Sequence, residues 1–160
     1  AGITTGQVVD AGIRDSMNMG AAMAPAAFHT VMQNLKDLEI TKKQLESGWY
    51  DKIITGDLGK IGKQALAEFI RNEGLEAEEF LMDCGMEIYD SSDQDTHAGG
   101  SGCGCSALVL GALILPNIQA GIWRRVLFIP TGALLSTGSF NEGQTIPGIA
   151  HGVILERMGK

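Results

Sequence analysis

Positive charge is scarce in this sequence. Its 160 residues include 12 lysines and arginines against 19 acidic residues, which gives a net charge of −7. No lysine or arginine occurs between residues 72 and 123, where nine of the acidic residues lie. Binding to nucleic-acid phosphates or to anionic lipids depends on a basic surface. The sequence therefore predicts neither partner, and its acidic middle is either a solvated surface or a cation site.

Cysteines and long apolar runs are also few. Three cysteines cannot all pair, and Cys103 and Cys105 are two positions apart, so a secreted disulfide framework is disfavoured. The longest apolar run, 107–115, stops before Pro116 and falls short of the roughly 20 residues of a spanning helix. We predict a buried helix there and no transmembrane segment. The chain begins without Met, a charged leader or a signal peptide, so we expect a part of a longer protein.

The hydrophobic pattern predicts an α/β fold in a single domain, 1–160. Strand-like runs, rich in β-branched and apolar residues, alternate with segments in which apolar residues recur at helical spacing. The expected order is βαβαβαββ, with a mixed, mostly parallel five-stranded sheet and helices on its faces. The strands are expected at 3–10, 49–55, within 80–89, at 125–129 and at 149–155, and the helices at 16–36, 61–70 and 103–121.

Three loops are expected to carry the ligand site, because ligands of such sheets collect beyond the carboxyl ends of the strands. They are residues 56–60, 90–102 and 131–136. The second loop is rich in glycine and leads into the helix predicted at 103–121, so its free amides suit a carboxylate or phosphate. The alternative is a set of tight turns, with Cys103 and Cys105 as small core residues.

Other chemistries at the 90–102 loop are weaker interpretations. Cys103 or Cys105 at a helix start, with His97, suggests an acyl-transfer pair. A metal cluster of these residues with Cys84 is disfavoured because the Cys-x-Cys spacing lacks a matching second pair. Three aspartates offer oxygen ligands for weak calcium binding, although their spacing is not that of an EF-hand. They are Asp90, Asp93 and Asp95.

Four segments of the chain have an unusual composition: NMGAAMAPAA at 18–27, TGDLG at 55–59, DTHAGGSGCGCSA at 95–107 and IPGIAH at 146–151. Together they resemble the stage V sporulation protein AD family of the thiolase superfamily. The order of elements and the segment PTGALLS at 130–136 also resemble the second half of the thiolase superfamily. The resemblance implies that this chain is a thiolase-like C-terminal half, without the N-terminal half of the full protein.

The resemblance implies a role in the spore rather than catalysis. It implies a protein that binds dipicolinic acid and supports its uptake into the developing spore, together with membrane-embedded partners of the same operon. The implied location is the forespore or spore, peripheral at the inner spore membrane through those partners, and a homodimer is one assembly to consider. The alternatives are a scaffold half-domain that docks spore membrane proteins, and a thiolase or ketoacyl-synthase type of acyltransferase.

The catalytic side chains of the related enzymes are missing from the matching positions. The enzymes carry a His-Ala-Asn type of motif after the strand that here ends at Thr55, and Gly56 and Gly59 replace its His and Asn. Their second catalytic loop contains an Asn that the segment GGSG at 99–102 lacks. Glycine offers no side chain for general base or oxyanion chemistry. We therefore expect a fold used for binding, with no catalytic residues.

The expected dipicolinate site combines residues of the three loops. Backbone amides at 101–104 are expected to take one carboxylate, His97 to donate a hydrogen bond, and Asp95 or Asp57 to share a calcium ion carried by the ligand. No cofactor and no resident metal are expected, and calcium enters only together with dipicolinate. The predicted ligand-binding residues are Gly56, Asp57, Asp95, His97, Gly100, Ser101, Gly102, Cys103, Thr131 and Gly132.

Overall fold

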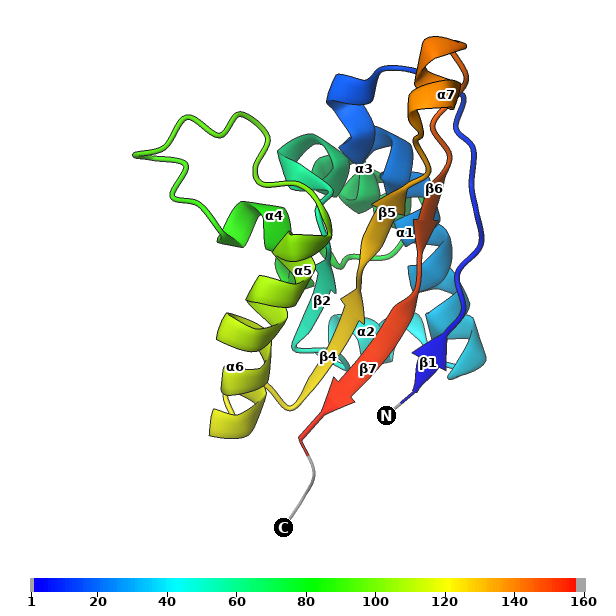
Figure 1. The fold of residues 1–160 in the computed structure, drawn as a ribbon. Helices are drawn as coiled ribbons and strands as arrows, with labels where there is room; N and C mark the ends of the chain where they lie inside the picture. Colours follow the sequence, from blue (N-terminus) through cyan, green and yellow to red (C-terminus); the bar gives the residue numbers. More distant parts are fainter. Residues whose placement is uncertain (1, 158–160) are drawn as a thin grey trace.

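A five-stranded sheet forms the centre of the computed structural model, which describes residues 2–157 (Figure 1). β2 pairs in parallel with β3 and β4, whereas β7 pairs antiparallel with β4 and β1. All strands of this sheet except β7 therefore point the same way, which confirms the predicted α/β class with a mixed sheet. The strands in spatial order are β1 (Ile3–Thr4), β7 (Gly152–Glu156), β4 (Arg125–Ile129), β2 (Lys52–Thr55) and β3 (Leu81–Asp83).

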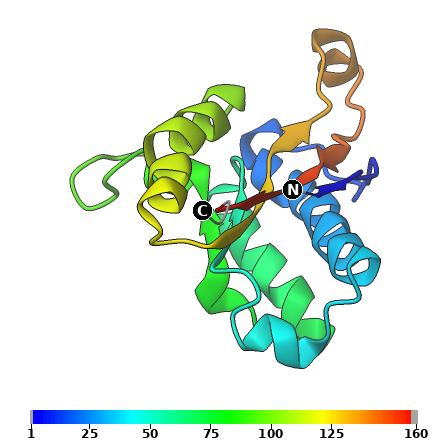
Figure 2. The same cartoon turned by 90° about the horizontal axis from the view of Figure 1, so that it is seen from below.

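Helices cover both faces of this sheet (Figure 2). α1 (Met19–Asp37) and α3 (Gly59–Asn72) pack together on one face. A continuous helical run lies on the other face. It consists of α5 (Cys103–Val109), a π-helical turn η3 (Leu110–Ile114) and α6 (Leu115–Ala120).

The sheet separates two hydrophobic cores. Because successive side chains of a strand point to opposite faces, neighbours on one strand enter different cores. Ile53 and Leu127 pack with α1 and α3, whereas Ile54 and Phe128 pack against the run from α5 to α6. The buried runs in β2 and β4 are therefore explained by helices on both sides.

Short elements complete the fold. α2 (Lys42–Glu46) follows α1 and begins with a capping box in which Thr41 and Gln44 satisfy each other's backbone amides. α4 (Cys84–Glu87) follows β3 directly. The remaining pieces are the 3₁₀ turns η1 (Ser16–Asn18) and η2 (Glu78–Phe80).

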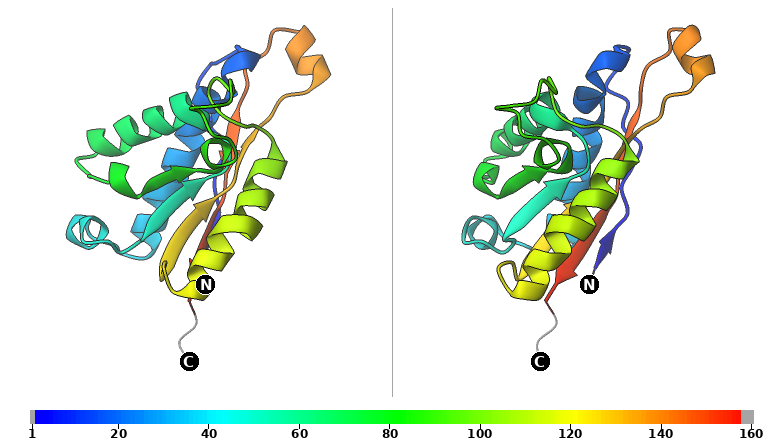
Figure 3. Two further views of the ribbon diagram at one scale, coloured as in Figure 1. Left: turned by 90° about the vertical axis from the view of Figure 1, so that its left-hand side faces the viewer. Right: turned by 60° about the vertical axis from the view of Figure 1, so that its left-hand side comes forward.

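A two-stranded arm projects beyond the main sheet (Figure 3). It consists of β5 (Thr131–Ala133), α7 (Thr137–Asn141) and β6 (Gly148–Ala150), with β5 antiparallel to β6. The strand predicted at 149–155 is therefore divided between two sheets, and the loop predicted at 131–136 begins as a strand. The strand predicted at 3–10 is also shorter: β1 ends at Thr4, and Val9 makes an isolated bridge to Gly148.

The helical run Cys103–Ala120 differs most from its prediction. Its 18 residues have a mean hydropathy of 1.6, yet only 22% of them are buried, so the expectation of a buried helix is wrong. In the described residues, this run is a helix with the length and apolar composition needed to cross a membrane. The core helices of soluble proteins pass the same test of length and composition. Leu108 is 57% exposed. The run is also irregular, because its middle turn, η3, is π-helical and ends shortly before Pro116.

Candidate functional site

Three loops converge on the carboxylate of Asp57, beyond the carboxyl end of β2. Its Oδ1 accepts a hydrogen bond from the Thr131 hydroxyl at 2.7 Å, and its Oδ2 accepts one from the Gly102 amide at 2.8 Å. The Asp57 amide donates in return to Thr131 Oγ1 at 3.0 Å. We call Asp57, Gly102 and Thr131 the Asp57 clamp. It joins the turn after β2, the start of α5 and the start of β5.

Gly56 lies beside the Asp57 clamp and has no room for a side chain. A Cβ at this position would lie 2.7 Å from both Ser106 Oγ and the Thr131 amide nitrogen. Such a separation is far shorter than a van der Waals contact, so the three loops approach this closely only around glycine. The structure therefore gives predicted site residue Gly56 a packing position.

A second carboxylate, Asp83, lies buried at the end of β3. It accepts hydrogen bonds from the Thr55 hydroxyl at 2.6 Å, the Leu58 amide at 2.8 Å and the Gly59 amide at 2.9 Å. Desolvation raises the pKa of Asp83, against the opposing effect of these hydrogen bonds. Asp83 thus holds the turn between β2 and α3, a role that the sequence analysis missed.

The glycine-rich loop is fastened above that turn. The Lys60 amide donates to the Ala98 carbonyl at 2.7 Å, and the Gly100 amide donates to the Gly85 carbonyl at 2.7 Å. Gly59 has a φ of 63°, and a Cβ there would lie 2.6 Å from the Ala98 oxygen. Residues 96–101 therefore keep a fixed position over the start of α3.

A cavity of about 370 Å³ lies between this loop, the β2–α3 turn and the start of α1. It has a mixed lining of thioethers, an imidazole, a carboxylate and backbone groups. We call it the Met–His cavity. Its lining includes four predicted site residues, Asp57, His97, Gly100 and Ser101, and the unpredicted Met17, Met19, Met23 and Leu58.

His97 lies on the wall between the Met–His cavity and a neighbouring cavity. This second cavity, of about 300 Å³, is lined by residues 96–99 and also by Lys60 and Tyr89. His97 has a φ of 51°, unusual for a residue with a Cβ, and its Nδ1 lies 3.3 Å from Asp95 Oδ1. Both side chains are 88% exposed. Lys60 thus adds a cationic residue beside His97, one that the sequence alone did not indicate.

The other predicted residues lie outside the lining of the Met–His cavity. Asp95 lines a third hollow, of about 410 Å³, within the 91–97 loop. Cys103 is exposed at the first position of α5, and Gly132 pairs with Ile149 in the arm. Gly102 and Thr131 belong to the Asp57 clamp, so the Gly102 amide that was expected to meet a ligand carboxylate already binds Asp57.

Two features of the site were outside the reach of the sequence analysis. The first is the group of methionines at 17, 19 and 23, of which Met23 is buried, 3% exposed, and Met17 is 92% exposed. Their clustering before Pro25 was the available indication, since flexible thioethers suit an adaptable binding surface. Lys60 had no indication in its local sequence, because it reaches the site through the packing of the 96–101 loop on α3.

A resident metal would find few ligands in this structure. Among residues 2–157, no group of three or more His, Cys, Asp or Glu side chains is arranged to hold an ion. Both oxygens of Asp57 already accept hydrogen bonds within the Asp57 clamp. A calcium ion bound here would therefore need most of its oxygen ligands from a bound molecule or from water.

We expect one of the three thiols to react in the native protein. Cys84 and Cys105 are buried, and burial raises the pKa of both thiols, that of Cys84 to about 12. Cys103 is exposed. A disulfide reagent such as Ellman's should therefore titrate one thiol quickly and three in denaturant, with the fast phase absent from Cys103→Ser. A fast phase of two or three thiols would contradict the buried positions.

Comparison with known proteins agrees with the segments identified in the sequence. The family model described as stage V sporulation protein AD matches residues 1–156. Stage V sporulation protein AD of Bacillus subtilis (strain 168) is 44% identical over 156 residues, which are 98% of this chain and 44% of that relative. The chain thus spans less than half the length of the curated relative that it matches.

Proposed function

This chain belongs to the stage V sporulation protein AD family, and from that premise we propose that it binds dipicolinic acid and supports its uptake into the developing spore, without catalysing a reaction. The observation that carries the proposal is the Met–His cavity beside the Asp57 clamp. Its volume of about 370 Å³ lies at the small end of ordinary ligand sites. A small, flat ligand suits it better than an acyl chain.

Dipicolinate is a pyridine ring with two carboxylates, and the cavity offers a surface for each part. Met19 and Met23 supply a thioether surface for the ring, a favourable contact for aromatic groups. His97 and Ser101 supply hydrogen-bond donors for a carboxylate. Lys60, which lines the adjoining cavity together with His97, supplies a positive charge for the second carboxylate.

The acidic surroundings set a condition on this binding. Asp93 and Asp95 lie in the same loop as His97 and repel a dianion. Lys60 offsets this repulsion, and so does calcium chelated by dipicolinate, whose open positions Asp95 would fill. In the second case Asp95 acts through the metal, as the sequence analysis proposed.

Absence of catalysis rests on side chains at the matched positions. In the family's enzymatic relatives a histidine and an asparagine follow the strand that here is β2, and this chain has Gly56 and Gly59 there. Ser106 and Thr131 occupy the space that a side chain at Gly56 would need, and the Ala98 carbonyl occupies the space at Gly59. The space of an acid-base side chain is thus taken by the protein itself.

The test is calorimetric titration of dipicolinate into this chain, with and without calcium. We expect His97→Ala and Lys60→Ala each to weaken binding about fivefold to tenfold, because each removes a charge-assisted contact. Lys63→Ala, one turn further along α3, is the matched control and should bind normally. Asp95→Asn should weaken binding only when calcium is present.

The same titration is then repeated with a longer protein, in which this chain is joined to the region of the relative that it does not match. Binding by both versions would support the Met–His cavity as the main site. Binding only by the longer version would require a contribution from outside this chain. Unchanged affinity in both His97→Ala and Lys60→Ala would reject the proposed site.

A second candidate function, a scaffold for spore membrane proteins, is favoured by the exposed apolar face of the run Cys103–Ala120. Leu108 is 57% exposed and Leu115 is 39% exposed on this face, and Ile122 just beyond it is 67% exposed. Exposed apolar side chains that gather on one face of a helix are typical of an interface. Such contacts would place the protein peripherally at the spore membrane. Absence of dipicolinate binding from both versions would favour this function.

A further inference from the structure

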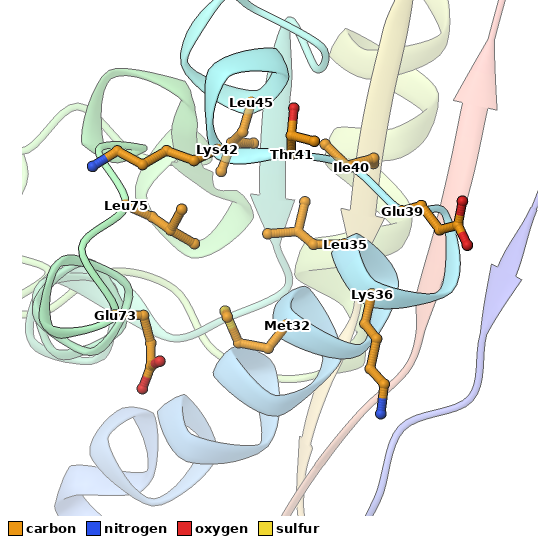
Figure 4. Close-up of a pocket in the computed structure, with 10 residues that line it drawn as sticks. All are labelled: Met32, Leu35, Lys36, Glu39, Ile40, Thr41, Lys42, Leu45, Glu73 and Leu75. Carbon is orange, nitrogen blue, oxygen red and sulfur yellow. The ribbon is translucent and has the colours of Figure 1, made fainter.

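Two long helices end at one surface groove on the side of the molecule that carries α2. α1 ends at Asp37 and α3 at Asn72, and the groove of about 330 Å³ lies between their ends (Figure 4). It is separate from the Met–His cavity, which lies at the opposite ends of the same helices. We call it the helix-end groove.

Both helices terminate in the same hydrogen-bonding motif. At the end of α1, the Ile40 amide donates to the Leu35 carbonyl at 2.8 Å and the Glu39 amide donates to the Lys36 carbonyl at 3.1 Å. At the end of α3, the Leu75 amide donates to Ile70 at 3.3 Å and the Gly74 amide to Arg71 at 2.8 Å. These pairs define Schellman motifs.

The two Schellman motifs build the apolar floor of the groove. In this motif the residue after the left-handed position folds back toward the helix and makes an apolar contact with it. Ile40 and Leu75 occupy that position and line the groove together with Met32, Leu35 and Leu45 (Figure 4).

The left-handed position holds different residues in the two motifs. Gly74 has a φ of 75°, which costs glycine nothing, whereas Glu39 has a φ of 52° and a Cβ. Residues held in strained conformations cluster at functional sites. The Glu39 side chain is exposed and borders the groove.

Negative charge gathers around the apolar floor. Each helix contributes the negative end of its dipole, and Glu39 and Glu73 add carboxylates on the two sides. Among residues 2–157, neither carboxylate has a hydrogen bond or an ion pair. Lys42 shows how a cation fits here: its ammonium donates to the Gly74 carbonyl and lies 3.6 Å from Glu46 Oε1. Lys36 is the remaining positive charge on the rim.

We infer that the helix-end groove binds a short segment of a partner protein in which an apolar side chain is flanked by lysine or arginine. The apolar side chain enters the space between Leu35 and Leu75, and the basic side chains reach Glu39 and Glu73. Lys42 already occupies the end of α3 and pairs with Glu46. The carboxylates of Glu39 and Glu73 and the end of α1 then face the single remaining cation, Lys36, so charge complementarity selects a basic occupant. The net charge of −7 favours a basic partner over the whole surface as well.

The probe is a capped peptide, acetyl-Lys-Leu-Leu-Lys-amide, with acetyl-Glu-Leu-Leu-Glu-amide as its charge-reversed control. Methyl NMR of the 160-residue chain at low ionic strength is expected to show shifts at Met32 and Leu75 with the basic peptide only. Changing Glu39 and Glu73 together to Gln should weaken the affinity about fivefold, the range of two exposed ion pairs. Glu68→Gln, an exposed acid of α3 that does not line the groove, should leave it unchanged.

Glu39→Gly separates binding from stability. It relieves the strained φ and is expected to raise the thermal unfolding midpoint by about 2–4 °C, while weakening peptide binding as Glu39→Gln does. A purely structural Glu39 would give the first result without the second. Equal binding of the acidic peptide, full affinity in the double variant, shifts confined to another surface, or no binding of the basic peptide would each overturn the inference.

Discussion

Replacing Asp83 with Ala is expected to lower the free energy of unfolding by about 3–5 kcal/mol. The substitution removes the acceptor for the Thr55 hydroxyl and for the amides of Leu58 and Gly59, all within 2.9 Å of its carboxylate oxygens. Asp83 itself is fully buried, so no water replaces it without a rearrangement. The turn before α3 then loses its anchor.

Urea unfolding followed by circular dichroism measures this loss. Asp83→Asn should cost less than Asp83→Ala, because the amide keeps the shape and one acceptor oxygen. Asp93→Ala, at an exposed position, is the control and should change stability by less than about 0.5 kcal/mol. A loss below about 1 kcal/mol in Asp83→Ala would show that the turn is held by other contacts.

The pH dependence of the same measurement has a defined sign. The pKa of Asp83 is raised in the folded chain above its ordinary value of 3.8, chiefly by desolvation. The folded state therefore binds this proton more tightly than the unfolded state. The contribution of Asp83 to unfolding free energy falls as pH rises from 3.8 through the raised pKa and is level above it. Asp83→Asn should lack this component.

The second large effect is expected from Asp57→Ala. This change removes both side-chain hydrogen bonds of the Asp57 clamp and so frees the start of α5 from the turn after β2. We expect a loss of about 2–3 kcal/mol in stability, because Asp57 is only half-buried and water reaches the freed groups. Dipicolinate binding should fall more than about tenfold if the Met–His cavity is the site, since Asp57 lines it.

Hydrogen exchange of the Gly102 amide is the direct measurement, because its acceptor is Asp57 Oδ2 at 2.8 Å. Exchange should accelerate in Asp57→Ala and stay slow in Thr131→Val, which keeps that bond. A double-mutant cycle between the two substitutions should give a coupling of about 1 kcal/mol through the Thr131 hydroxyl. Additive losses, or unchanged exchange at Gly102, would mean that the clamp does not hold the loops together.

The main elements were predictable because their patterns are local. The β-branched and aliphatic run at 125–129 predicted β4 at its observed bounds, and the helical spacing of Ile61, Leu66 and Ile70 predicted α3. The short helices α2, α4 and α7 were missed, since segments of four or five residues gain helical structure from their surroundings. The exposure of the run Cys103–Ala120 was missed because an apolar composition is the same for a helix buried in the core and for one whose outer side is exposed.

The convergence of the three loops was predictable, but the partners of their side chains were not. The rule that ligands collect at carboxyl strand ends selected Asp57, Gly102 and Thr131. Their hydrogen bonds to one another depend on distances that only the folded chain defines. The role of Asp83 was not predictable, because an acid buried with three hydrogen-bond donors has the same sequence pattern as an acid in a loop.

The position of the sheet between two unequal cores has a consequence for local opening. α1 and α3 support one face together, whereas the other face has a single irregular helical run whose outer side is exposed. A smaller buried cluster holds that run in place, so we expect it to detach from the sheet at a lower free energy than α1 and α3. Gly102 of the Asp57 clamp is the residue directly before α5. A contact that covers the outer side of the run would therefore also stabilise the Met–His cavity, and loss of that contact would loosen the cavity before the sheet itself unfolds.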